Sequence, residues 1–172
     1  AGEQGELIQA ILHGKTQEEV EKLAEFYDYI EIQPNGNNAF MLRSTRDIHE
    51  NINSEEDLIN INKRLVEIAD KQGKLVVATG DVHFLDEKDA KFRAIIMASK
   101  GFEDADEQAP LYFKTTSEML SDFAWAGDRA KEFVVDNPNK IADMIQDDIR
   151  PIPPGTYQPH IDGADEELTE KC

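Results

Sequence analysis

Apolar residues recur along the chain with helical spacing in some stretches and strand-like spacing in others. The longest helical pattern covers residues 54–72, and its apolar face is formed by Leu58, Ile61, Leu65 and Ile68. Ser54 is a favourable N-cap residue at its start, and Gly73 suits the left-handed position that follows a helix end. The pattern therefore predicts one long amphipathic helix near the middle of the chain.

Shorter helical patterns lie before this helix. The run GELIQAIL is followed by Gly14, which favours a helix end at that position. The next run opens with Thr16 and has Glu19 three residues later, the spacing of a capping box. Two short helices are therefore expected within residues 5–26.

Further helices are expected after residue 85. Asp86 can cap a helix that carries the apolar residues Phe92, Ile95 and Ile96. Thr115 and Glu118 have capping-box spacing at the start of another. In the stretch GDRAKEFVVDNPNKIADMI we expect two helical segments, with Asn137 capping the second and Pro138 in its first position.

Two stretches have the composition of strands. In YDYIEIQ, Ile30 and Ile32 alternate with polar residues, and PNGNN follows with residues typical of turns. In KLVVATG the apolar run is unbroken, as in buried parallel strands. The alternation of helix and strand along the chain predicts an α/β fold with parallel pairing.

Composition narrows the classes of function. The 172 residues include 18 basic and 36 acidic side chains, a formal charge of −18, which argues against a general nucleic-acid interface. The single cysteine, Cys172, excludes an internal disulfide framework and a cysteine-based zinc cluster, and favours a reducing, cytoplasmic setting. No apolar stretch approaches the roughly 20 residues that cross a bilayer, so no membrane partner is expected.

The composition changes after Arg150. Residues 151–172 carry four prolines, at positions 151, 153, 154 and 159, and are expected to form an extended connector rather than part of a core. We therefore divide the chain into a folded part, 1–150, and a connector, 151–172. The first residue is not methionine and the last residues continue a polar pattern, so we expect the chain to be a piece of a longer protein.

The stretch KLVVATGDVHFLDEKDA contains the candidate functional residues. In it, Asp81 and His83 follow the expected buried strand. Residues two apart in an extended segment point to the same side, so the two side chains are expected to converge at the carboxyl end of that strand. A carboxylate with an imidazole suits zinc, manganese or iron. The alternative is that Asp81 caps a turn while His83 packs at the strand end, and the residue pattern leaves both open.

Other candidate ligands have no fixed spacing relative to this pair. His13 lies at an expected helix end, His49 in a polar loop and His160 in the proline-rich tail. Glu6 and Glu31 are further carboxylates that could face the same cleft as Asp81. From the residue pattern alone, Asp81 and His83 therefore supply half of a metal site, without further ligands at a fixed spacing.

Several long stretches resemble one protein family. LAEFYDYIEIQPNGNNAFM, LVVATGDVHFLDEKDAKFRAIIMASKGFEDADEQAPLYFKTTSEML and NPNKIADMI with IRPIPPGTYQPHIDGADEEL are similar to the PolC-type bacterial DNA polymerase III alpha subunit. Within that family the chain resembles the carboxyl-terminal portion of the PHP (polymerase and histidinol phosphatase) domain. The tail resembles the junction that leads to the polymerase palm.

This resemblance implies a fold and a metal cluster. PHP domains resemble a distorted TIM-like barrel with up to three metal ions at the carboxyl ends of the strands, so the chain would form the later part of such a barrel. Asp81 and His83 match the final D-x-H ligand motif. A Cys-x-x-Gly-Glu motif is matched by GEQGE, with Gly2 at the cysteine position followed by Gly5 and Glu6, which removes one expected ligand. Zinc or manganese is then expected in the intact domain, and only weak or no binding by this segment alone.

The resemblance also implies a function. The chain would be a structural or metal-binding fragment of a replicative DNA-directed DNA polymerase (a nucleotidyltransferase), with no catalytic residue of its own. Its partners would be the upstream PHP half, the inserted exonuclease and the palm, and DNA would be contacted through the full protein. The alternative is that the intact PHP domain is a metal-dependent hydrolase, a 3'-5' exonuclease or pyrophosphatase. A free-standing α/β binding protein is a third reading, and unpaired strand edges favour self-association of the fragment.

Overall fold

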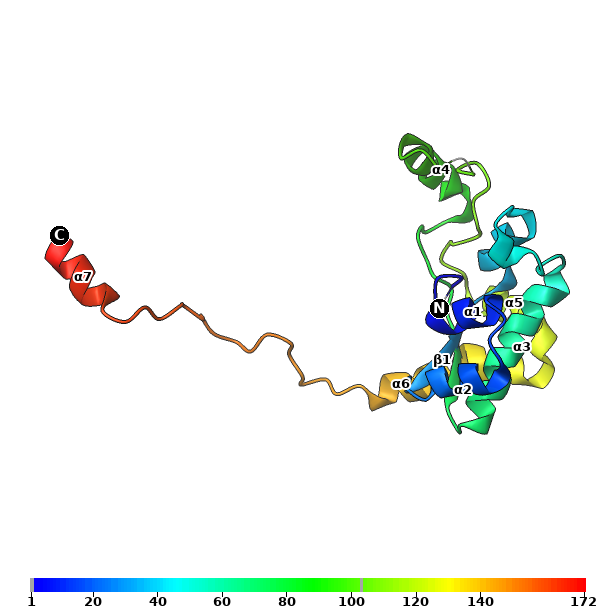
Figure 1. Cartoon of the computed structure of the whole chain (residues 1–172), viewed down its shortest axis with the longest axis horizontal. Helices are drawn as coiled ribbons and strands as arrows, with labels where there is room; N and C mark the ends of the chain where they lie inside the picture. The colour runs from blue at the N-terminus through cyan, green and yellow to red at the C-terminus, as the bar shows by residue number, and fades with distance from the viewer. Residues whose placement is uncertain (1, 103) are drawn as a thin grey trace.

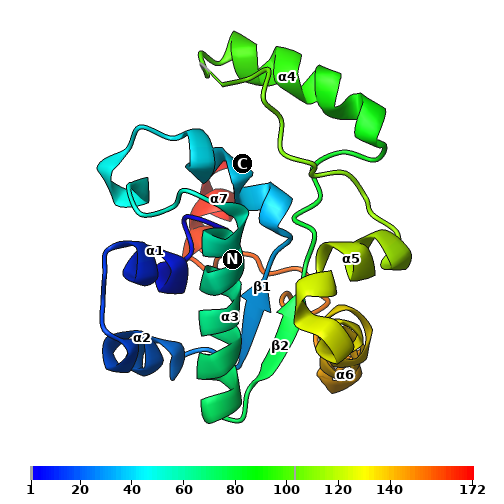
Figure 2. The same cartoon turned by 90° about the vertical axis from the view of Figure 1, so that its right-hand side faces the viewer.

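Two parallel strands form the centre of the fold. The computed structural model describes residues 2–102 and 104–172, and in it β1 (Tyr29–Ile32) pairs with β2 (Leu75–Ala78) in parallel, with Ile30 opposite Val76. Helices surround this small sheet (Figures 1 and 2). The predicted α/β class and parallel pairing are confirmed, whereas two strands do not establish a PHP-type barrel, which stays a prediction.

Helical elements account for most of the remaining regular structure. The α-helices are α1 (Glu6–Leu12), α2 (Gln17–Ala24), α3 (Glu55–Lys71), α4 (Ala90–Ser99), α5 (Thr116–Asp122), α6 (Asn137–Met144) and α7 (Ala164–Lys171). The 3-10 turns are η1 (Asn35–Arg43), η2 (Asp47–His49), η3 (Glu87–Asp89) and η4 (Ala124–Arg129), and a π-helical turn, η5, covers Glu132–Asp136.

The long helix α3 covers one face of the sheet. Its buried face contains the predicted residues Leu58, Ile61, Leu65 and Ile68. Ile30 and Ile32 of β1 are buried in the same core, as their alternation predicted. A capping box between Ser54 and Asp57 starts the helix, and Gly73 follows its end with a φ of +66°. The predicted helix is confirmed within one residue at each end.

On the other side, the π-helical turn and α6 form one continuous helical stretch against β2. The expected interruption with Asn137 as a cap is wrong, since Asn137 is buried and its Nδ2 atom donates to the main-chain oxygen of Val76 at 2.8 Å. Pro138 has no N–H to donate to the preceding turn. The wider hydrogen-bond ring of η5 accommodates this missing donor, so the helix continues through the proline.

The segment after β1 is more ordered and more buried than a turn. PNGNN opens the 3-10 turn η1, and Asn35, Asn37 and Asn38 are buried. From α3, the Nδ2 atom of Asn62 donates to Gln33 O at 3.0 Å and to Asn35 Oδ1 at 3.2 Å. Asn35 is therefore hydrogen-bonded inside the protein, and the predicted turn residues belong to a buried 3-10 turn.

Helix α4 stands away from the body of the molecule (Figures 1 and 2). It begins at Ala90, four residues after the expected cap Asp86, which precedes the short turn η3 instead. None of its residues is buried. Its apolar side chains therefore lie outside the core.

The C-terminal residues run as an extended chain away from the folded part (Figure 1). Residues 151–160 are exposed and form no helix or strand, and α7 follows them. The helix α7 was not predicted, and the division at residue 150 stays a prediction. No helix among the described residues has the length and apolar character needed to span a membrane.

Candidate functional site

The candidate site lies in the loop that leaves β2. Asp81 has a φ of +51°, the one positive value among the described non-glycine residues. The expectation that this segment is extended is therefore wrong, and side-chain alternation does not place Asp81 and His83 together. They are nevertheless neighbours, because the left-handed turn brings His83 Nδ1 to 3.9 Å from Asp81 Oδ1.

His83 is oriented by the main chain. Its Nδ1 atom lies 2.7 Å from the main-chain oxygen of Asp81, and a carbonyl oxygen can only accept, so Nδ1 carries the proton. This tautomer leaves the Nε2 lone pair available. A metal-binding histidine is commonly held in this way, with its other nitrogen donating to a carbonyl or carboxylate. The side chains of His83 and Asp81 are 42% and 48% exposed, so a ligand can reach both.

Two neighbouring segments hold this loop. The N–H of His83 donates to Leu111 O at 2.8 Å, and Asn37 Nδ2 donates to Gly80 O at 3.0 Å. The segments themselves touch where Gly36 meets Pro110, since a Cβ on Gly36 would lie 2.9 Å from Pro110 Cγ. The buried η1 turn and the 109–111 segment therefore position the backbone of the candidate site.

Asp81 borders a groove on the face of the sheet opposite α3. The groove has a volume of about 430 Å³, and its lining includes Glu31, Thr79 and Asp81. The Thr79 hydroxyl donates to the Glu31 carboxylate across the two strands. The suggestion that Glu31 faces the same cleft as Asp81 therefore agrees with the geometry.

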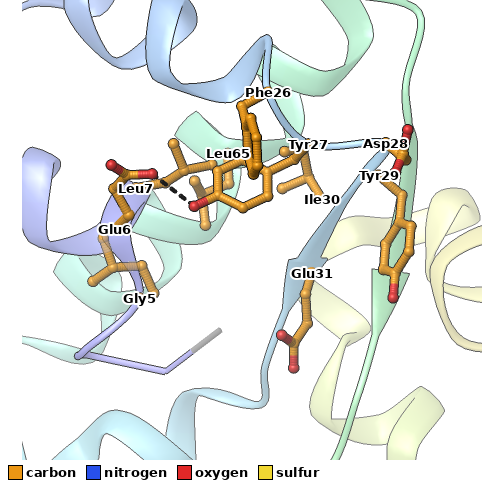
Figure 3. A pocket seen from close by; sticks show the side chains of 11 residues that line it. Gly5, Glu6, Leu7, Phe26, Tyr27, Asp28, Tyr29, Ile30, Glu31 and Leu65 are labelled. Carbon is orange, nitrogen blue, oxygen red and sulfur yellow. Dashed lines mark hydrogen bonds between the residues drawn. The ribbon is translucent and has the colours of Figure 1, made fainter. Parts of the chain in front are cut away.

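Glu6 lies elsewhere. It borders a second cavity, of about 460 Å³, beside β1, lined largely by apolar side chains (Figure 3). Glu31 lines both this cavity and the groove at Asp81, whereas Glu6 lines only this one. The Tyr27 hydroxyl donates to Glu6 at 2.6 Å, and this hydrogen bond to an acidic group raises the pKa of Tyr27. Gly2, at the expected cysteine position, is near Gln33, whose Oε1 would lie 3.2 Å from a Cβ on Gly2.

Three histidines lie away from the loop. His13 Nδ1 is 2.7 Å from Gln9 O at the end of α1, and His160 pairs with Asp162 at 3.0 Å in the tail. His49 is buried rather than in an open polar loop. Across residues 2–102 and 104–172, no group of three or more His, Cys, Asp or Glu side chains has metal-binding geometry.

A buried polar cluster surrounds Glu3, and the sequence does not predict it. The Glu3 carboxylate accepts from Arg46 Nη1 at 3.0 Å, lies 3.1 Å from His49 Nε2, and accepts from Gln9 Nε2 at 3.1 Å. Glu3 and His49 are both nearly inaccessible to solvent. Because these residues come from three separate segments, no local spacing announces the cluster.

Curated relatives match the chain along nearly its whole length. DNA polymerase III PolC-type of Clostridium perfringens is 47% identical over 169 residues, and that of Caldanaerobacter subterraneus is 49% identical over 169 residues. The Bacillus subtilis protein of the same description is 38% identical over 174 residues. These alignments cover 98%, 98% and 99% of this chain. The chain belongs to the PolC-type DNA polymerase III family.

The match covers one part of these polymerases. The chain spans 11–12% of the length of the PolC-type relatives named above. No family model matches it. The resemblance inferred from the sequence is therefore confirmed at the level of the PolC-type family.

Proposed function

We propose that this chain is a structural and metal-binding segment of a replicative DNA polymerase, equivalent to the later part of a PHP domain. The chemistry of nucleotide addition would be carried by other parts of the longer chain. The similarity to PolC-type polymerases supports the first statement, and the acidic composition agrees with a segment that does not itself grip DNA.

The orientation of His83 carries the metal-binding part of the proposal. Its Nδ1 proton is directed to Asp81 O, which leaves Nε2 as a ligand atom beside the Asp81 carboxylate. This donor set fits zinc or manganese. Asp81 and His83 would hold the ion together with ligands from the rest of the polymerase chain, and a bound divalent ion would polarise phosphate oxygens or lower the pKa of a water.

In this proposal the site stabilises the polymerase rather than performing its synthesis. A metal joining residues of distant segments contributes its binding free energy to folding. The loop positions both ligands through contacts with η1 and the 109–111 segment, so binding there would couple these segments to the rest of the domain.

The experiment compares full-length polymerases. One carries Asp81→Asn with His83→Ala, and a control carries Asn60→Ala at an exposed position of α3. We expect the double variant to lose at least about tenfold in metal affinity, measured by elemental analysis after dialysis against graded chelator. It should also unfold at a lower temperature, with DNA synthesis per folded molecule unchanged.

Two results would contradict the proposal. Unaltered metal content in the double variant would remove Asp81 and His83 from the site. Loss of DNA synthesis with normal folding would assign them to the polymerase reaction. Phosphodiester or pyrophosphate hydrolysis that disappears in the same variant would favour the alternative, a metal-dependent hydrolase in the intact PHP domain.

A further inference from the structure

Helix α4 exposes a stripe of large apolar side chains. Phe92, Ile95 and Ile96 are 54%, 66% and 55% accessible to solvent. They are three and four residues apart, so they share one side of the helix. Contiguous apolar surface of this kind usually marks a contact with another part of a protein.

The opposite side of α4 is already covered by its own loop. Ala94 and Met97 are partly buried, the N–H of Phe102 donates to Met97 O at 3.2 Å, and Arg93 donates to Gln108. These contacts fix the rotation of the helix within the arm formed by residues 85–102 and 104–113. The apolar stripe therefore points away from its own loop.

Further apolar side chains lie at the base of this arm. Leu85 and Phe113 are 69% and 65% exposed. The N–H of Phe113 donates to both Phe84 O and Leu85 O at 3.1 Å, which joins the outgoing and returning chain. Figure 2 shows α4 beyond this junction, separate from the body of the protein. In the arm, Leu85 and Phe113 therefore add to the exposed apolar surface of α4.

Basic residues flank the stripe. With 100° between successive residues of a helix, Lys91 falls on one side of the stripe and Lys100 on the other. The chain as a whole has a charge of −18, so this basic border differs from its surroundings. Symmetric pairing of α4 with α4 of a second copy would place lysines against lysines, which is unfavourable.

We propose that the stripe Phe92, Ile95 and Ile96 is a docking surface for another segment of the same polymerase chain, one with an apolar centre and acidic borders. This rests on the proposed function, in which the chain is part of a longer polymerase. PolC-type relatives extend far beyond the matched part, which is 11–12% of their length. A covalently attached partner meets the stripe at high effective concentration.

Photo-crosslinking in the full-length polymerase tests this. The residue p-benzoylphenylalanine replaces Phe92 in one protein and Asn60, an exposed polar position on α3, in a matched control. Crosslinked peptides are identified by mass spectrometry in an equal mixture of 14N- and 15N-labelled protein. We expect position 92 to crosslink severalfold more than position 60, to a segment outside these 172 residues, without 14N–15N hybrids.

A charge variant supplies an independent readout. Lys91→Glu with Lys100→Glu should lower the crosslinking yield at position 92 severalfold, because the basic border would no longer match an acidic partner. Lys22→Glu, at an exposed position on α2, should leave the yield unchanged. Both lysines are exposed, and Lys91 Nζ lies 4.9 Å from the centre of the Phe92 ring, so these variants change the surface of the stripe and leave the core intact.

Three outcomes overturn the docking proposal. These are hybrid crosslinks between two copies, crosslinks confined to this segment, and a yield equal to that at position 60. None of them affects the metal content of the Asp81 and His83 variant, so failure here is distinguishable from failure of the proposed function. A normal yield after reversal of both lysine charges would overturn the acidic character of the partner.

Discussion

Asn137 donates a buried hydrogen bond from its Nδ2 atom to the main-chain oxygen of Val76, 2.8 Å away. Val76 lies in β2, and Asn137 begins α6, 61 residues later in the chain. A side chain therefore satisfies a strand oxygen for which the described part of the chain offers no third strand. This contact fixes the helical C-terminal part of the fold against the sheet.

We predict that Asn137→Ala destabilises the chain by about 1–3 kcal/mol, because a buried carbonyl would lose its partner. Asn139→Ala is the matched control, since Asn139 makes a similar bond to Val135 O at 2.8 Å but is exposed. Its effect should stay within about 0.5 kcal/mol. Urea unfolding measures both, and equal effects would remove the special role of the buried contact.

The role of Asn137 shows where sequence reasoning about the fold stops. The helix α3 and strand β2 follow from local pattern, because their apolar residues face one core and their caps are adjacent in sequence. Asn137 beside Pro138 has the sequence of a helix cap, but the tertiary contact with Val76 takes precedence. The same limit applies to α4, whose apolar spacing predicts a helix but not whether its apolar side is buried.

We predict that Gly36→Ala destabilises the chain by about 1–3 kcal/mol, because the new methyl group would lie 2.9 Å from Pro110 Cγ. The 109–111 segment, whose Leu111 O accepts from His83 N–H, should shift with it. A double-mutant cycle with Pro110→Ala checks the cause. If the two changes are additive in urea unfolding, overpacking at this contact is not the reason.

Part of the candidate site could be foreseen from sequence. A carboxylate and an imidazole after a buried strand indicate a site. The strand β2 forms at the position that the sequence predicted, directly before Asp81 and His83. The positive φ of Asp81 was not foreseen, since aspartate adopts both extended and left-handed conformations. The Glu3 cluster was also missed, because Arg46 and His49 reach it only through tertiary folding.

The left-handed backbone at Asp81 predicts an order of stability between two variants that both remove the carboxylate. Asp81→Gly should be more stable than Asp81→Ala by about 1 kcal/mol, because glycine adopts positive φ without a Cβ penalty. Thermal unfolding in the presence of chelator makes the comparison without any contribution from metal. If alanine is equally stable, the loop does not hold this conformation in solution.

Acid should loosen the start of α5 through its capping carboxylate. The main-chain N–H of Thr115, and then its hydroxyl, donate to Glu118 and lower the pKa of that carboxyl below its ordinary value of 4.5. A carboxyl whose pKa is lower in the folded state stabilises that state above its unfolded pKa. This contribution is lost as the pH falls from 4.5 through the lower folded value. Protection from amide exchange at the first turn of α5, measured against the intrinsic exchange rate at each pH, should therefore fall in that window.

Glu118→Gln separates titration from capping. Glutamine at this position can still accept from Thr115, but it has no proton to bind in this range, so the acid dependence at α5 should disappear. The first turn of α3 is an internal control, because Ser54 lowers the pKa of Asp57 there in the unchanged part of the chain. Amide exchange at both helix starts is measured in one pH series. An acid-dependent loss of protection that persists at α5 in the variant would assign the effect to another group.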